Sequence, residues 1–167
     1  LNTIYHYIFS IIIYKKIKSE GKKCFAVVAT AGTTVRGAID PITEIAQFCQ
    51  KENIWLHVDG AIGGVYGLSK ITSDIVEGIS FADSITINPQ KILGITKTSS
   101  ILIVSDFGVL KNTFNTGLPY LSSEGNSLNR GELGIQGSRP AEIIKLWLGL
   151  RFLGMQGIET VSYTHLT

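Results

Sequence analysis

The stretch SITINPQK, at residues 84–91, decides how the rest of the chain is interpreted. An apolar strand pattern over residues 82–88 runs directly into a polar turn, and Lys91 lies just past its end. A second strand pattern, IWLHVD at residues 54–59, ends in Asp59. Two predicted strands therefore each have an ionisable side chain at or just past their carboxyl end.

Two further strands complete the predicted sheet, and one helix is predicted between the first two strands. FAVVAT, at residues 25–30, is a continuous apolar run typical of a strand buried on both faces. SSILIVS, at residues 99–105, predicts a fourth strand. Between the first two strands, Pro41 suits the first turn of a helix over residues 41–51, and Asp40 is its expected N-cap. This order of elements predicts an α/β fold with a mostly parallel sheet and flanking helices.

The carboxyl ends of the strands are the expected location of a ligand, because open α/β sheets bind ligands beyond those ends. Thr34, Asp59 and Lys91 all lie at or just past such an end. We therefore expect these three residues to share one site.

Other stretches are less regular. Residues 60–67 are glycine-rich, residues 71–78 predict a short helix, and residues 106–137 suggest a long loop. Residues 140–153 form a strong amphipathic pattern that is expected to end at Gly154. Residues 1–23 are compatible with a helix or a buried strand, and periodicity does not decide between them.

Composition narrows the class of protein. The chain has 167 residues, 44% hydrophobic and 17% charged, which suits about one globular domain. Its net charge of +2 is scattered apart from a lysine cluster at residues 15–23 without interleaved aromatics, so no nucleic-acid partner is expected. Cys24 and Cys49 make neither a disulfide framework nor a metal spacing, which favours a cytoplasmic location. The apolar run at residues 4–13 is far shorter than the roughly 20 residues of a membrane span.

Lys91 and Asp59 suggest the two poles of one cofactor. A lone lysine after a strand is most often a surface charge, but one partly desolvated at a strand end can attack a carbonyl carbon. Pyridoxal phosphate binds in this way, and an acid keeps its ring nitrogen protonated. The alternative for Asp59 is a helix cap or surface acid, yet GAIGG at residues 60–64 begins no obvious helix and leaves room for a flat ring.

Several motifs resemble the group II pyridoxal-phosphate-dependent amino-acid decarboxylases, which include the aromatic, glutamate, cysteine-sulfinate, histidine and diaminobutyrate enzymes. The motifs are ATAGTT at 29–34, GAIDP at 37–41, WLHVDGA at 55–61, ADS at 82–84 with NPQK at 88–91, and GSR at 137–139 with KLW at 145–147. The resemblance covers roughly residues 22–158. It implies part of the large domain of a fold type I pyridoxal phosphate enzyme.

The resemblance implies a role for each matching residue. Lys91 matches the lysine that binds the cofactor covalently, and Asp59 matches the acid paired with the pyridine nitrogen. Ala61 matches the small residue on one ring face, Thr34 matches the threonine beside the ring, and Asn88 lies in the turn that contributes to phosphate binding.

Four other residues carry weaker expectations. His57 matches the histidine of a His-Val-Asp pattern and is expected to bind the cofactor, with a packed strand residue as the alternative. Tyr120 resembles a mobile-loop tyrosine that reprotonates the substrate carbon, although a tyrosine that only packs is also possible. Arg139 resembles an arginine near the start of the small domain, or is a surface charge at a helix start. Gln90 stands where the family usually has histidine; glutamine can bond a phosphate oxygen but does not titrate near neutral pH.

The implied activity is decarboxylation of an L-amino acid to an amine and carbon dioxide, with a homodimer as the intact enzyme. Another fold type I enzyme, an aminotransferase or carbon–carbon lyase, and an inactive truncated product remain open as alternatives.

The expected organisation is that of a fragment. Residues 1–22 are an uncertain N-terminal segment, residues 23–137 are the C-terminal half of the cofactor domain, and residues 138–158 start the small-domain helix. Residues 159–167 are expected to be a tail foreign to the family, resembling translated adapter sequence. Such a fragment should expose apolar faces, and be insoluble or partly folded and inactive by itself.

Overall fold

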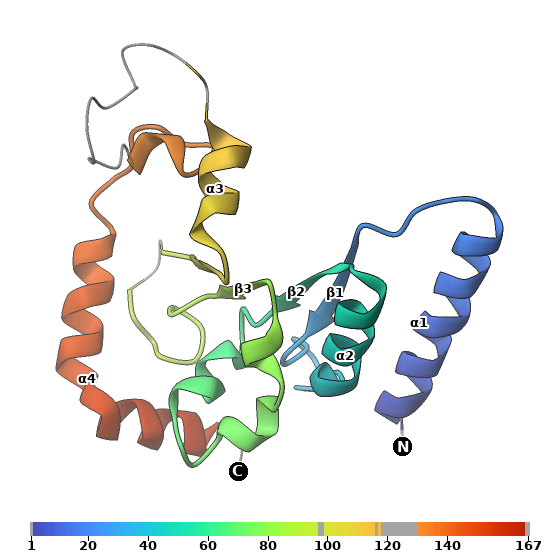
Figure 1. Ribbon diagram of the computed structural model, residues 1–167. Helices are drawn as coiled ribbons and strands as arrows, with labels where there is room; N and C mark the ends of the chain where they lie inside the picture. Colours follow the sequence, from blue (N-terminus) through green and yellow to red (C-terminus); the bar gives the residue numbers. More distant parts are fainter. Residues whose placement is uncertain (1, 97–98, 116, 118–129, 166–167) are drawn as a thin grey trace.

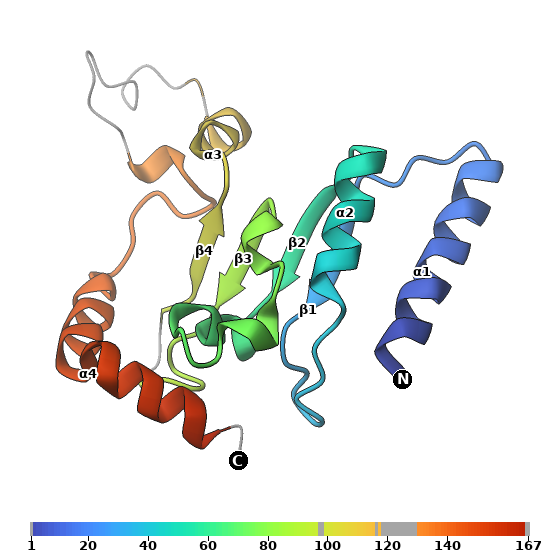
Figure 2. The same cartoon turned by 60° about the horizontal axis from the view of Figure 1, so that its bottom comes forward.

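A four-stranded sheet forms the centre of the computed structural model, which describes residues 2–96, 99–115, 117 and 130–165. The strands are β1 (Ala26–Thr30), β2 (Trp55–Asp59), β3 (Ser84–Ile87) and β4 (Ile101–Val104), adjacent in that order. β1, β2 and β3 are parallel, and β4 is antiparallel to β3 (Figure 2). The four predicted strands and the mostly parallel sheet are therefore confirmed.

Helices cover one face of this sheet and also lie beyond its two edge strands. The α-helices are α1 (Asn2–Ser19), α2 (Ile42–Glu52), α3 (Phe107–Phe114) and α4 (Ile143–Thr164); the 3₁₀ helices are η1 (Gly63–Leu68), η2 (Ser73–Val76), η3 (Ile79–Phe81) and η4 (Arg130–Glu132). α2 and the η1–η3 turns lie on the same face of the sheet, whereas α1 lies beyond the β1 edge and α4 on the opposite side of the molecule (Figure 1).

The covered face of the sheet carries the core. Alternate strand residues face α2 and the 3₁₀ turns, so Leu56 and Val58 are almost completely buried. α2 meets them with its predicted apolar stripe, which consists of the buried residues Ile42, Ile45, Ala46 and Cys49. Burial raises the pKa of the Cys49 thiol to about 11, so this cysteine is a packing residue at neutral pH.

Asp40 does not cap α2, so this prediction was wrong. The N-cap position is Pro41, without a side-chain cap, and the Asp40 carboxylate instead accepts a hydrogen bond of 2.8 Å from the Thr30 backbone N–H. A second bond, from the Asp40 N–H to the Thr30 carbonyl, ties the same residue to the end of β1. Asp40 therefore satisfies the backbone of an edge strand rather than that of the helix.

The other face of the sheet is open. It carries Trp55, His57 and Asp59 from β2, with Ser84 and Thr86 beside them on β3. Two apolar residues at its margins, Val28 and Leu102, are 63% and 53% exposed.

Three segments differ from their sequence predictions. Residues 71–78 form 3₁₀ turns rather than a regular helix, and the predicted loop at 106–137 contains α3, whose N-cap Asp106 accepts a bond from the Gly108 N–H. α4 begins at Ile143 and continues beyond Gly154, where the backbone kinks (φ 58°, ψ −178°), to Thr164. The expected foreign tail is thus largely helical, and Ser162 within it is buried.

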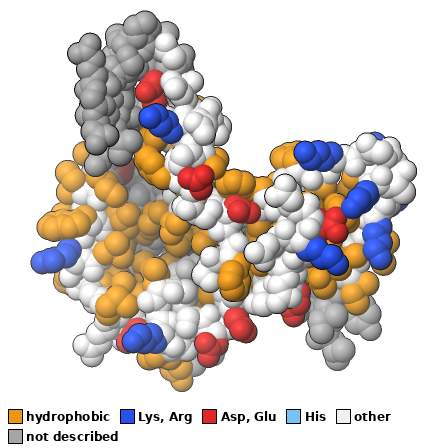
Figure 3. Space-filling view, in the orientation of Figure 1, with side chains coloured by type: hydrophobic (Ala, Val, Ile, Leu, Met, Phe, Trp, Pro, Cys, Tyr) orange, Lys and Arg blue, Asp and Glu red, His pale blue; other side chains and the backbone are white. Residues whose placement is uncertain are grey.

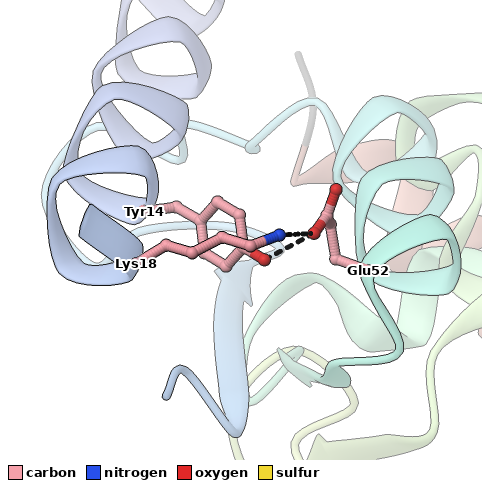
Figure 4. A network of polar contacts seen from close by, with 3 residues as sticks. All are labelled: Tyr14, Lys18 and Glu52. Atoms are coloured by element: carbon pink, nitrogen blue, oxygen red, sulfur yellow. Dashed lines mark hydrogen bonds and ion pairs between the residues drawn. The ribbon is translucent and has the colours of Figure 1, made fainter. Parts of the chain in front are cut away.

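α1 resolves the ambiguity at the N-terminus in favour of a helix, and its last turns are attached to α2 by polar contacts. The Tyr14 hydroxyl donates to Glu52 Oε2 at 2.5 Å, and Lys18 Nζ donates to the same oxygen at 3.0 Å (Figure 4). The Tyr14 ring also packs edge-on against Phe48, with ring centroids 5.0 Å apart. Between α1 and β1 lies a hollow of about 720 Å³, lined mostly by apolar side chains.

Candidate functional site

The carboxyl ends of three parallel strands form the edge on which the predicted site lies. Thr30 of β1 pairs in register with Asp59, and Asp59 pairs with Thr86 of β3. Asp59 is therefore flanked by a threonine on each side and is itself exposed. Lys91 follows in the turn after β3, and its side chain is also exposed.

Three hydrogen bonds connect Asp59 to Lys91 through two other predicted site residues. The Ala61 N–H donates to Asp59 Oδ1 at 3.1 Å, and the Asn88 N–H donates to the Ala61 carbonyl at 3.3 Å. The Lys91 N–H then donates to the Asn88 carbonyl at 3.0 Å. The turn after β2 and the turn after β3 are thus held together, and these two turns carry the acid and the amine.

The glycines of the GAIGG stretch pack internally rather than forming an open floor. A Cβ on Gly63 would lie 2.6 Å from the Ala31 carbonyl oxygen, and one on Gly64 would lie 2.8 Å from Ile87 Cγ1. Both glycines are buried, so η1 packs backbone-to-backbone against the strand ends. The room expected there for a flat ring is filled by the protein itself, and Ala61, which is half-buried, is the small residue left at the surface.

The turn after β3 presents polar groups beside Lys91. Ser100 donates its hydroxyl hydrogen to Asn88 Oδ1 at 2.6 Å, which leaves the Asn88 amide nitrogen as a donor for another group. Gln90 Oε1 is buried without a hydrogen-bond partner in the described part of the chain. No ion pair among the described residues involves Lys91 or Asp59.

The remaining predicted residues are placed differently. Thr34 is exposed in the turn that follows β1, and no hydrogen bond joins it to Asp59 or Lys91 among the described residues. His57 is hydrogen-bonded within the sheet, to Ser84 and Thr86. Arg139 is exposed before α4 and donates from Nε to the Gln136 carbonyl at 3.1 Å. Tyr120 lies outside the described residues.

Sequence reasoning missed three residues that support the site. Ser100 orients Asn88, while Ser84 and Thr86 bind His57 on the open face. The alternation of polar and apolar residues in SITI, at 84–87, was the available signal, because it places both hydroxyls on one face. Within the described residues, we find neither a cluster of side chains able to hold a metal nor a helix able to cross a membrane.

The chain matches the model of the pyridoxal-dependent decarboxylase conserved domain over residues 10–167. The chain belongs to the pyridoxal-dependent decarboxylase family. The match is wider than the expected 22–158 and includes the helical segment after Gly154. The family assignment from the motifs is confirmed.

Curated relatives in this decarboxylase family are cysteine sulfinic acid decarboxylase of Rattus norvegicus and of Homo sapiens, each 38% identical over 147 residues. Acidic amino acid decarboxylase GADL1 of Bos taurus is 37% identical over 151 residues. These alignments cover 85–87% of this chain but only 29–30% of the relatives. The chain thus spans about 30% of the length of the curated relatives it matches.

Solved structures of the same family confirm the fold. Mouse CSAD in its apo form superimposes with a TM-score of 0.80 at 36% identity, covering 90% of this chain and 31% of that one. Oryza sativa TDC with PLP and tryptamine also gives a TM-score of 0.80, at 25% identity, covering 87% and 31%. The fold is therefore part of a fold type I pyridoxal phosphate domain, and the family's cofactor is pyridoxal phosphate, as expected.

The residues present fit that cofactor. An exposed amine, an exposed carboxylate and the Asn88 amide are carried by turns that hydrogen-bond to one another, and their chemistry suits an aldehyde, a ring nitrogen and a phosphate respectively. The unpartnered Gln90 oxygen shows that the polar groups of this turn are incompletely satisfied by the described residues.

Proposed function

We propose that this chain is the lysine-bearing part of a longer decarboxylase that uses pyridoxal phosphate to convert an L-amino acid into an amine and carbon dioxide. The observation that carries the proposal is the hydrogen-bonded connection from Asp59 through Ala61 and Asn88 to Lys91. Family membership supports it independently.

Each residue has a defined task in this proposal. Lys91 Nζ holds the cofactor's aldehyde carbon and yields it to the amino group of the substrate. Asp59 holds a proton on the ring nitrogen, and the Asn88 amide donates to the phosphate. The bound cofactor supplies an electron-withdrawing ring that accepts the electron pair left when carbon dioxide departs.

Other residues are assigned by the resemblance. Tyr120 delivers a proton from its hydroxyl to the former α-carbon, and Thr34 lies beside the cofactor ring. Gln90 adds a hydrogen bond near the phosphate, and Arg139 lies where the small domain begins. These assignments extend beyond the contacts described above.

The substrate and the assembly also follow from what the chain resembles. We infer a small acidic L-amino acid, because the cysteine sulfinic acid and acidic amino acid enzymes are 36–38% identical, whereas Oryza sativa TDC is 25% identical. We also infer a cytoplasmic homodimer: the resemblance implies the dimer, and two free cysteines without a disulfide framework favour the cytoplasm.

Borohydride reduction of the full-length protein with pyridoxal phosphate tests the proposal. We expect the reduced cofactor on Lys91, its loss in Lys91→Arg and its retention in Lys70→Arg, which changes another exposed lysine. Release of carbon dioxide from cysteine sulfinate, aspartate, glutamate or tryptophan then identifies the substrate. Keto-acid release without carbon dioxide would indicate an aminotransferase, and absence of trapping would contradict the proposal.

A further inference from the structure

Four side chains on the open face of the sheet form a continuous hydrogen-bonded chain, the 55–86 relay: Trp55, Ser84, His57 and Thr86. Trp55 Nε1 donates to Ser84 Oγ at 2.9 Å. Ser84 Oγ lies 2.8 Å from His57 Nδ1, and His57 Nε2 lies 3.3 Å from Thr86 Oγ1. The relay crosses between β2 and β3 and ends at Thr86, which pairs in register with Asp59.

The donor and acceptor groups of these four side chains determine the direction in which the hydrogen bonds of the relay run. The indole N–H of Trp55 is only a donor, so Ser84 Oγ must accept from it. If Ser84 also accepted from His57 Nδ1–H, the Ser84 hydroxyl hydrogen would lack an acceptor among the described residues, and Ser84 is only 7% exposed. A buried unpaired donor costs about 1–3 kcal/mol, so this arrangement is disfavoured.

The opposite direction leaves no buried hydrogen unpaired. Ser84 then donates to His57 Nδ1, the neutral ring carries its hydrogen on Nε2, and Nε2–H donates to Thr86 Oγ1. The only unassigned hydrogen is that of the Thr86 hydroxyl; Thr86 is half-buried and pairs in register with the exposed Asp59, although no hydrogen bond joins the two side chains among the described residues. Asp59 Oδ1 already accepts from the Ala61 N–H, which leaves Oδ2 as an acceptor.

We propose that His57 is a positioning residue for Asp59 rather than a ligand of the cofactor. With its hydrogen on Nε2 it donates to Thr86 Oγ1, which leaves the Thr86 hydroxyl hydrogen for the neighbouring Asp59 carboxylate once that carboxylate turns toward it. That carboxylate is then fixed in orientation toward the ring nitrogen, and this last step rests on the function proposed above. His57 thus affects the orientation of the Asp59 carboxylate indirectly, through the Thr86 hydroxyl.

The direction of the relay is tested by ¹⁵N NMR of the full-length protein without cofactor, labelled on histidine. His57→Asn identifies the His57 signals by their loss. We expect Nε2 to carry the hydrogen and Nδ1 to be bare at neutral pH. The reverse form, or a doubly protonated ring, would overturn the proposal, and neither result depends on whether the protein is a decarboxylase.

The action on Asp59 is tested with threonine variants of nearly constant shape. Thr86→Val removes the hydroxyl and should weaken cofactor binding about tenfold, since hydrogen bonds to charged groups have this magnitude. Thr86→Ser should restore affinity to within about threefold. Thr30→Val is the matched control, because Thr30 flanks Asp59 in the same register row but no hydrogen bond joins its hydroxyl to the relay.

Cofactor affinity is measured by absorbance titration, with the spectrum of the bound cofactor as a second readout and thermal unfolding of the cofactor-free protein as a check on folding. Wild-type affinity in Thr86→Val, or an equal loss in Thr30→Val, would overturn the proposal. If the unaltered protein binds no pyridoxal phosphate, the proposed function fails, while the NMR result still decides the direction of the relay.

Discussion

At the residue scale, the two charged groups of the site, the Asp59 carboxylate and the Lys91 amine, have few partners among the described residues. Asp59 uses one carboxylate oxygen for the Ala61 N–H, and Lys91 makes no ion pair among the described residues. Both groups are exposed at the carboxyl edge of the sheet. Charged groups without structural partners at a strand end are available for a ligand.

Asp59→Asn should separate cofactor attachment from catalysis. The amide keeps the shape but cannot hold the ring nitrogen in its protonated form, so we expect decarboxylation to fall at least ~100-fold. Borohydride trapping at Lys91 should persist, because the amine is unchanged. Asp74→Asn, at an exposed acid in η2, is the control and should retain activity. Full activity in Asp59→Asn would show that this acid is not the ring's partner.

At the element scale, the close approach of η1 to the strand ends fixes the geometry of the edge. The Gly63 N–H donates to the Ala31 carbonyl at 2.9 Å, and the Gly64 N–H donates to the Gly60 carbonyl at 2.8 Å. These contacts are possible because neither glycine has a Cβ. The turn that carries Ala61 is consequently held between the ends of β1 and β3.

Gly63→Ala should disturb this packing. Its Cβ would meet the Ala31 backbone, which cannot move without shifting β1, so we expect a loss of about 1–3 kcal/mol in the free energy of unfolding. Weaker cofactor binding should accompany the loss. Gly137→Ala is the matched control, because a Cβ there has no atom within 4 Å. Equal denaturant midpoints for the two variants would contradict the packing argument.

The contact between α1 and α2 should depend on pH at both extremes. The hydrogen bond from Tyr14, followed by that from Lys18, lowers the pKa of Glu52 below its ordinary 4.5. Its contribution to stability is therefore present above that value and is lost as pH falls through the lowered pKa. The bond to Glu52 also raises the pKa of Tyr14 and of Lys18, so their contributions are present below pH 10 and are lost as pH rises through the raised values.

Glu52→Gln should remove the acid limb of this dependence. We expect the thermal midpoint of the variant to fall less than that of the unaltered protein between neutral pH and about pH 4, since the amide does not titrate. The effect should be small, because the contact is at the surface. Glu44→Gln, on the same helix but without an ion pair among the described residues, should behave like the unaltered protein. Identical profiles for both variants would show that the contact does not support α1.

At the scale of the whole molecule, the most prominent surface feature is apolar area without cover. Hydrophobic side chains gather on the face that includes α4 (Figure 3). Trp147 and Phe152 of α4 are 59% and 91% exposed, and the open face of the sheet exposes Val28. Apolar patches of this kind mark interaction surfaces.

The chain produced by itself should therefore associate. We expect sedimentation velocity to show oligomers or aggregates, with no decarboxylase activity. Replacing both Trp147 and Phe152 by glutamate should reduce association, whereas Val35→Glu, at an exposed residue on the turn after β1, should not. A monodisperse and active monomer would contradict this expectation.

Local periodicity and motif spacing were sufficient to predict the four strands, the apolar stripe of α2 and the position of Asp59 and Lys91 at strand ends. The sequence also identified the family. It did not determine that Asp40 bonds to β1, that α3 interrupts the predicted loop, or that the glycines fill the space beside the edge.

These three features could not be predicted, because each of them depends on a neighbour that is distant in sequence. His57 shows the difference most clearly. Its motif suggested a contact with the cofactor, but the pairing of β2 with β3 places it between Ser84 and Thr86. Local sequence specifies which residues lie on a strand face, whereas the register between strands specifies what each of them can bond.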